Sequence, residues 1–165
     1  TIWNWDLYSP GWFAAGFGGN SVGSEPLSAG AGVALQLIRK MIINEELDAD
    51  SVPTGTLELL KMAPSKWLED GKKIVIEKMP TCFGEVSLNL RSQLAGNKLS
   101  GRFDASSLAG LKKAVLWLRP PGGPPIKAVR CNGQNQSDFG TDAVTLPLTG
   151  VVEFEVEFES VGKVH

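Results

Sequence analysis

Apolar and polar residues alternate with a period of two over most of the chain after residue 56. Val86, Leu88 and Leu90 are separated by polar residues, and four apolar residues between 152 and 158 alternate with four glutamates between 153 and 159. This alternation is typical of strands with one face in the core and the other in water. It predicts about eight short strands between roughly 56 and 160, at 57–62, 73–77, 85–91, 98–104, 114–118, 126–131, 144–148 and 152–159.

Turn signals separate these strands. Asp70-Gly71 and Gly96-Asn97 are tight-turn pairs, and Asn132-Gly133 is the strongest short hairpin signal in the chain. The proline-glycine run at 120–125 cannot be a strand and predicts an exposed connection. No helical pattern lies between the strands, which favours antiparallel pairing. The fold class predicted is mainly β, an antiparallel, jelly-roll-like β-sandwich.

The pattern before residue 50 is different. Apolar residues from Leu27 to Ile42 recur at three- and four-residue steps, which predicts one amphipathic helix at about 26–46. Ser24 is the expected N-cap and Pro26 suits the first turn. Residues 47–56 are expected to form a linker. A single sandwich can hardly bury the apolar stripe of this helix, so an uncovered stripe would indicate an oligomer or a second protein chain.

Residues 1–24 are rich in aromatic residues and glycine and follow neither a helical nor a strand period. They predict a loop that either packs over the edge of a core or lines a groove for a flat ligand. Two domains are therefore expected, an aromatic loop plus helix at 1–50 and a β-sandwich at 56–165.

Composition and charge narrow the classes of partner. The 165 residues include 16 basic and 18 acidic side chains, a formal net charge of −2. Nucleic acid is not expected as a partner, because phosphate binding needs a concentrated basic surface. No apolar run is long enough to span a membrane. The localisation, secreted or cytoplasmic, stays open.

The cysteines and histidine say little about metals or redox state. Cys82 and Cys131 could form a disulfide, although buried free thiols are the preferred interpretation. The chain has no CxxC motif, and its one histidine, His165, is the last residue, so no zinc site is expected. Calcium is the one cofactor left open, through Asn135, Asp138 and Asp142. The alternative for these three residues is a solvated hairpin loop.

Four stretches carry a resemblance to a known architecture: RKMIINEEL, TLELLKMAPSKWLEDGKKIVIEKMPTCFGEVSLNLRS, AVLWLRPP and PIKAVRCNGQ. Together they resemble the C-terminal part of glycoside hydrolases built as an (α/α) barrel followed by a β-sandwich. The resemblance implies that residues 20–50 are the last barrel helix and residues 56–160 the sandwich. In such enzymes the catalytic carboxylates lie in the barrel. The chain alone is therefore not expected to catalyse hydrolysis, and a catalytic barrel or a second protein chain is the expected protein partner.

Candidate carbohydrate-binding residues are those with aromatic rings that a sugar can stack on. Trp3, Trp5, Trp12 and Trp67 are the best platforms, whereas Trp117 lies in a strand that is apolar on both faces and is expected in the core. The ligand expected for these platforms is a polysaccharide or oligosaccharide.

Candidate catalytic residues are Asp6 and Glu25, which lie in or beside the aromatic segment. Glycoside hydrolysis needs two carboxyl groups across the scissile bond. The preferred interpretation of Asp6 is nevertheless a turn or capping carboxylate, and that of Glu25 is a charge in the first turn of the helix. Serine nucleophile chemistry has no base near it, and GFGGN is not a phosphate-binding loop because no GK[ST] follows it.

Three functions from different classes follow. The preferred one is a non-catalytic β-sandwich module that binds or supports binding of a polysaccharide. The others are a part of a glycoside hydrolase that works with paired carboxylates, and a structural domain whose helix docks on another subunit. A linear row of exposed tryptophans would favour the binding module. A cleft with Asp6 near Glu25 would favour the part of a glycoside hydrolase, and an uncovered helix stripe would favour the docking domain.

Overall fold

The computed structural model describes residues 28–160. The chain divides into two compact units, Thr1–Lys40 and Met41–His165, and the second holds both sheets. Asp6, Glu25, Trp3, Trp5 and Trp12 lie outside the described residues, as do the expected helix N-cap and the aromatic loop.

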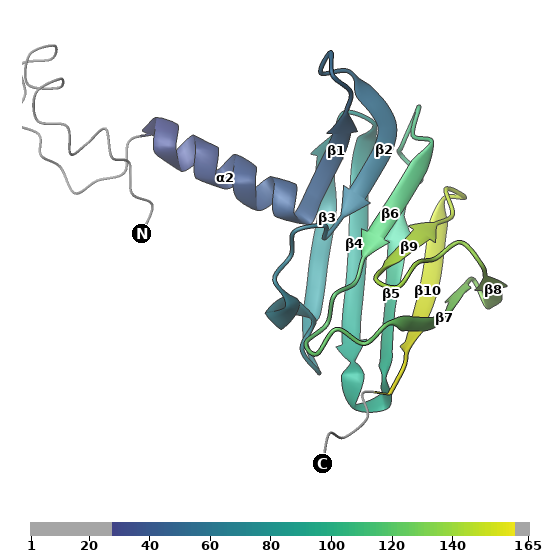
Figure 1. The fold of residues 1–165 in the computed structure, drawn as a ribbon. Coiled ribbons are helices and arrows are strands. Elements are labelled where there is room, and N and C mark those ends of the chain that lie inside the picture. The colour runs from purple at the N-terminus through teal and green to yellow at the C-terminus, as the bar shows by residue number, and fades with distance from the viewer. Residues whose placement is uncertain (1–27, 161–165) are drawn as a thin grey trace, which may run out of the picture. The chain divides into compact units, whose positions relative to one another are not determined.

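One α-helix, α2 (Ser28–Ile42), precedes the strands (Figure 1). Arg39 and Lys40 lie in its last turn, where positive charge stabilises the carboxyl end of a helix. Large apolar side chains on this helix are exposed to water: Val33, Leu35, Leu37 and Ile38.

The predicted end of the helix at about residue 46 is wrong. The segment Ile43–Leu47 is strand β1, which pairs antiparallel with β2 (Pro53–Leu59). Ile43 lies opposite Leu59, and both residues are fully buried. Burial of Ile43 in the sheet therefore ends the helix at Ile42, although the helical pattern favours its continuation.

The expected linker at 47–56 is mostly a hairpin. Asp48 Oδ1 accepts hydrogen bonds from the backbone N–H groups of Asp50 and Val52, at 3.0 and 2.9 Å, which closes the turn between β1 and β2. The first strand predicted, at 57–62, therefore begins earlier, at Pro53, and ends at Leu59.

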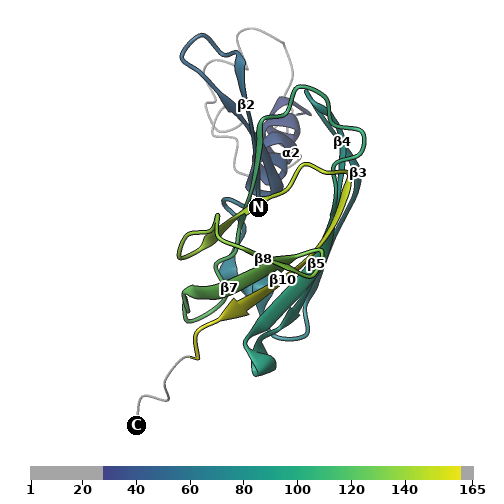
Figure 2. The ribbon, with the colours of Figure 1, turned by 90° about the vertical axis from the view of Figure 1, so that its right-hand side faces the viewer.

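The prediction of a mainly β fold built as a β-sandwich is confirmed. The described strands form two sheets, one of order β1-β2-β6-β9 and one of order β3-β4-β5-β10-β7-β8, and Figure 2 shows them as two layers. The remaining strands are β3 (Lys73–Thr81), β4 (Gly84–Gln93), β5 (Lys98–Asp104), β6 (Lys113–Trp117), β7 (Ile126–Cys131), β8 (Gln134–Gln136), β9 (Ala143–Leu146) and β10 (Val151–Phe158). A jelly-roll connection of these strands stays a prediction.

The expectation of purely antiparallel pairing holds for every described strand pair except one. β2 and β6 are parallel, with Leu57 opposite Ala114 and Leu59 opposite Leu116. No helix is needed for this crossover because the chain between the two strands forms β3, β4 and β5 of the other sheet. The two sheets are therefore interleaved along the chain.

The core lies between the sheets and is filled by the alternate residues that the pattern identified. Val86, Leu88, Leu90 and Phe103 come from the six-stranded sheet, and they are at most 1% exposed. Leu57, Leu59 and Leu116 come from the four-stranded sheet and are fully buried. The Asn132-Gly133 turn between β7 and β8 is confirmed, with φ of 50° and 77°, as a tight hairpin requires.

Candidate functional site

Trp67 lies on a short 3-10 helix, η2 (Ser65–Leu68), at the edge of the six-stranded sheet. The buried hydroxyl of Ser92 on β4 donates a 2.8 Å hydrogen bond to the carbonyl oxygen of Leu68, and Leu68 is itself only 2% exposed. These contacts hold η2 against the sheet. The neighbouring Trp67 keeps 36% of its surface exposed, so it is presented to solvent on a fixed support.

An open groove of about 460 Å³ lies beside this tryptophan. We call it the Trp67 groove, and it is lined by Lys66, Trp67, Glu69, Lys72, Lys73 and Ile74. It thus combines one large aromatic surface with charged groups that can donate or accept hydrogen bonds. Of the four tryptophans predicted as sugar platforms, Trp67 is the one within the described residues.

A row of polar side chains crosses the outer face of the six-stranded sheet. The register places Lys73 opposite Arg91, Arg91 opposite Ser100, Ser100 opposite Glu155, and Glu155 opposite Arg130. Directly opposed residues of antiparallel strands lie on the same face, with Cβ atoms about 5 Å apart. We call these five residues the outer row.

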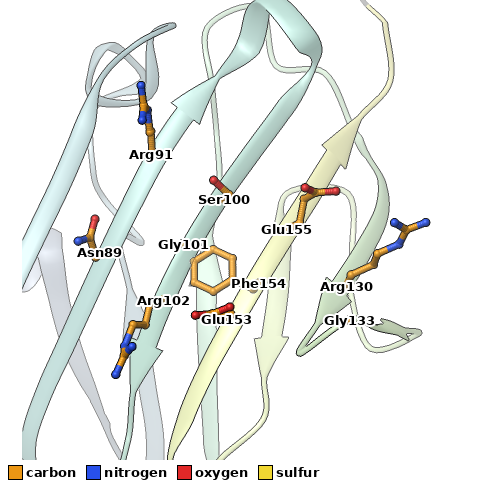
Figure 3. Close-up of a pocket in the computed structure, with 10 residues that line it drawn as sticks. All are labelled: Asn89, Arg91, Ser100, Gly101, Arg102, Arg130, Gly133, Glu153, Phe154 and Glu155. Atoms are coloured by element: carbon orange, nitrogen blue, oxygen red, sulfur yellow. The ribbon is translucent and has the colours of Figure 1, made fainter.

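A second groove, of about 530 Å³, lies over this row (Figure 3). We call it the arginine groove, since Arg91, Arg102 and Arg130 line it together with Glu153 and Glu155. Lys73 of the Trp67 groove lies directly opposite Arg91 of the arginine groove on the neighbouring strand.

Small residues form the middle of the arginine groove. Ser100 presents a short side chain, whereas Gly101 belongs to the inner face, opposite buried Leu90 and Phe154. A Cβ atom at Gly101 would overlap the ring of Phe154 and lie 2.5 Å from the backbone oxygen of Asn89, so no larger residue fits there without a shift. Figure 3 shows the charged side chains arranged around this central region.

The charged groups of the arginine groove are only partly paired. Lys98 Nζ lies 3.1 Å from Glu155 Oε1, and Arg130 Nε donates to Asn135 Oδ1 at 3.2 Å. The side chains of Arg91, Arg102 and Glu153 have no hydrogen-bond or ion-pair partner within the part of the chain that the structure describes. Arg102 and Glu153 are direct cross-strand neighbours, yet they do not form an ion pair.

The outer face of the four-stranded sheet carries a closed network instead. Glu58 is 6% exposed, and its Oε2 accepts hydrogen bonds from Asn44 Nδ2 at 2.8 Å and from Lys61 Nζ at 2.7 Å. Arg119 Nε donates to Asp142 Oδ2 at 2.7 Å.

Trp117 belongs to this network, so the expectation that it is a core residue is wrong. It is half-buried on the outer face, because it alternates with Leu116 and Leu118, which take the inner positions. The Arg119 guanidinium lies 4.6 Å from the centroid of its ring. Its indole Nε1 is buried and has no hydrogen-bond partner among the described residues.

Two of the three residues considered for calcium have hydrogen-bond partners in the protein. Asn135 accepts a hydrogen bond from Arg130 and Asp142 accepts one from Arg119. Within residues 28–160, no group of three or more His, Cys, Asp or Glu side chains is placed to hold a metal ion. The expectation of calcium remains untested.

The two cysteines are not joined in a disulfide. Cys131 is buried on β7, and burial raises the pKa of its thiol, because a thiolate is disfavoured away from water. Cys82 is exposed between β3 and β4, so the expectation of a buried thiol holds for Cys131 and not for Cys82.

Sequence reasoning missed the arginine groove. It read the glutamates of β10 as a solvated strand face and assigned no role to the arginines of β4, β5 and β7. The alternation did indicate that these residues point outward. The signal it lacked was the sheet order, which places β10 between β5 and β7.

Comparison with known proteins identifies no relative. No protein-family model, curated protein or solved structure matches the chain. Among the described helices, none is long and apolar enough to cross a membrane.

Proposed function

We propose that this chain is a carbohydrate-binding β-sandwich module associated with a glycoside hydrolase. The observation that carries the proposal is the Trp67 groove, in which a partly exposed indole ring forms a wall beside several charged side chains. The resemblance to the C-terminal part of barrel-and-sandwich glycoside hydrolases supports the same class of ligand.

The chemistry of the groove suits a sugar. The apolar C–H face of a pyranose ring can stack on the exposed indole, which is a large and rigid apolar surface. Glu69 can accept hydrogen bonds from sugar hydroxyls, and Lys66 and Lys72 can donate to their oxygens. Because η2 is held by Leu68 and Ser92, little conformational entropy is lost when a ligand binds.

The test is calorimetric titration of the 165-residue chain with a panel of polysaccharides. Trp67→Ala is expected to weaken binding by about tenfold or more, since stacked aromatic residues dominate such sites. Trp117→Phe is the matched control, because it changes a tryptophan on the other sheet and should leave the affinity unchanged. Undiminished binding by Trp67→Ala would rule out the proposed site.

A docking domain is the second candidate, and the exposed apolar side chains of α2 favour it. Val33 and Leu37 are each 58% exposed and Leu35 is 67% exposed. Exposed apolar surface of this kind marks contact sites with other proteins. Light scattering after size exclusion should then show an oligomer or a complex with a second chain, which Leu35→Ser with Ile38→Ser dissociates. A monomer that is unaffected by these changes would exclude docking through a second copy.

A further inference from the structure

The two grooves concentrate positive charge. Three lysines and three arginines line them, against three glutamates, whereas the whole chain has 16 basic and 18 acidic side chains. A local excess of positive charge on a protein of negative net charge favours a ligand that carries negative charge.

The arginines determine which anion suits the site. Guanidinium groups are planar and bind carboxylates through two parallel hydrogen bonds. Arg91 and Arg102 have no partner of this kind among residues 33–160, and Arg130 uses only its Nε, so their remaining N–H groups face solvent. A carboxylate brought into the groove can therefore bind without displacing an existing ion pair from either Arg91 or Arg102.

The glutamates restrict the ligand further. Glu153 and Glu155 lie among the arginines and would repel a polymer with one phosphate per unit. They can accept hydrogen bonds from hydroxyl groups. The groove thus suits a molecule in which carboxylates are separated by hydroxyl-bearing units, and this is the chemistry of an acidic saccharide.

The outer row connects this groove with Trp67. From Lys73 on β3 to Arg130 on β7 the row crosses four strand spacings, or about 19 Å at 4.8 Å each. This is long enough for an extended ligand rather than a single sugar. Such a ligand would run across the strands, with one end beside Trp67 and the other among the arginines.

We propose that the Trp67 groove and the arginine groove form one binding path for a polysaccharide that contains uronic acid carboxylates. Arg91 and Arg102 bind the carboxylates, and Glu153 accepts hydrogen bonds from hydroxyl groups. The Trp67 end of this path rests on the function proposed above, whereas the arginine end stands on its own contacts.

The test compares an acidic oligosaccharide, in which glucuronate alternates with an uncharged sugar, with its methyl ester, which has the same sugar rings but no charge. The double variant Arg91→Gln with Arg102→Gln should weaken binding of the acid by about tenfold or more, as expected when charge-assisted hydrogen bonds are lost. Its affinity for the ester should not change. Lys113→Gln with Lys127→Gln removes the same total charge from positions that line neither groove, and should change the affinity for the acid less than about twofold.

The outcomes separate this inference from the proposed function. Trp67→Ala should weaken the acid and the ester alike. If Trp67→Ala changes neither while the arginine variant weakens the acid, the Trp67 site fails and the arginine groove stands. The inference is overturned if the acid does not bind, if acid and ester bind equally, if the lysine control loses as much affinity as the arginine variant, or if inorganic phosphate competes as well as the acid.

Discussion

The outer faces of the two sheets differ in how their polar side chains are used. On the four-stranded sheet, Glu58 is held by Asn44 and Lys61, and Arg119 is held by Asp142. On the six-stranded sheet, Arg91 and Arg102 make no such bond within the described part of the chain. The six-stranded face also has ion pairs, such as Lys98 with Glu155, but Arg91 and Arg102 lie outside them.

This difference distinguishes polar side chains that stabilise the fold from polar side chains that are available to bind a ligand. A buried carboxylate such as Glu58 must keep its partners, because removing one leaves a charged group without compensation. An exposed guanidinium costs little when unpaired, since water solvates it. The four-stranded face is therefore expected to respond to mutation through stability, and the six-stranded face through ligand affinity.

The largest effect is expected where the two sheets meet. Phe103→Ala removes a fully buried ring from the shared core and should lower the free energy of unfolding by about 3–5 kcal/mol. Urea unfolding followed by circular dichroism should keep one transition for both sheets. Leu148→Ala, at a 36% exposed position, is the control and should cost only about 0.5 kcal/mol. Two separate transitions would show that the sheets do not share a core.

The comparison itself is tested by one change on each face. Lys61→Met removes a partner of the buried Glu58 carboxylate and should destabilise the protein by about 1–3 kcal/mol. Arg91→Gln also removes one positive charge, but from an exposed and unpaired position, and should change stability by no more than about 0.5 kcal/mol. Equal losses in urea unfolding would contradict the distinction between the faces.

The hairpin at the edge of the arginine groove gives a smaller effect. Gly133→Ala places a Cβ on a residue with φ of 77°, which should cost about 1–2 kcal/mol although nothing lies within 4 Å of the added atom. Gly96→Ala is the matched control, because Gly96 is equally open but has no positive φ, and it should be neutral or slightly stabilising. If both variants lose the same stability on thermal melting, backbone conformation is not the cause.

The cysteines provide the smallest effect, and it depends on pH. Burial raises the pKa of Cys131, so the unfolded chain loses this proton first as the pH rises. The stability that this thiol contributes is present below the ordinary pKa of a cysteine thiol, and it is lost as the pH rises through the higher pKa of the folded state. Thiol labelling at pH 8 should modify exposed Cys82 in the native protein and Cys131 only after unfolding. Rapid labelling of both thiols would show that the buried face of β7 is accessible to solvent in the native protein.

Alternation along the chain predicted the fold class because side-chain period reports which face is buried. It placed Val86, Leu88 and Leu90 in the core and the glutamates of β10 in water, as the structure has them. It did not predict that Ile43 starts a strand, since the sheet contact that decides this comes from Leu59.

The candidate site was harder to predict. Trp67 could be named as a candidate platform from its residue type alone. The arginine groove could not, because its residues come from four strands and β10 is inserted between β5 and β7, far from its neighbours in sequence. Residue pattern within a strand carries no information about which strand lies next to it.

The parallel pairing of β2 and β6 has a consequence for how the protein is made. During synthesis the β1–β2 hairpin leaves the ribosome before the other strands, but the strand that completes its inner edge follows only after β3, β4 and β5. Until then the hairpin holds a row of backbone N–H and C=O groups without a partner, and Leu57 and Leu59 without a core. Long-range pairing of this kind slows folding and prolongs exposure to aggregation. The nascent chain therefore passes through a stage in which a chaperone has a defined apolar strand to protect.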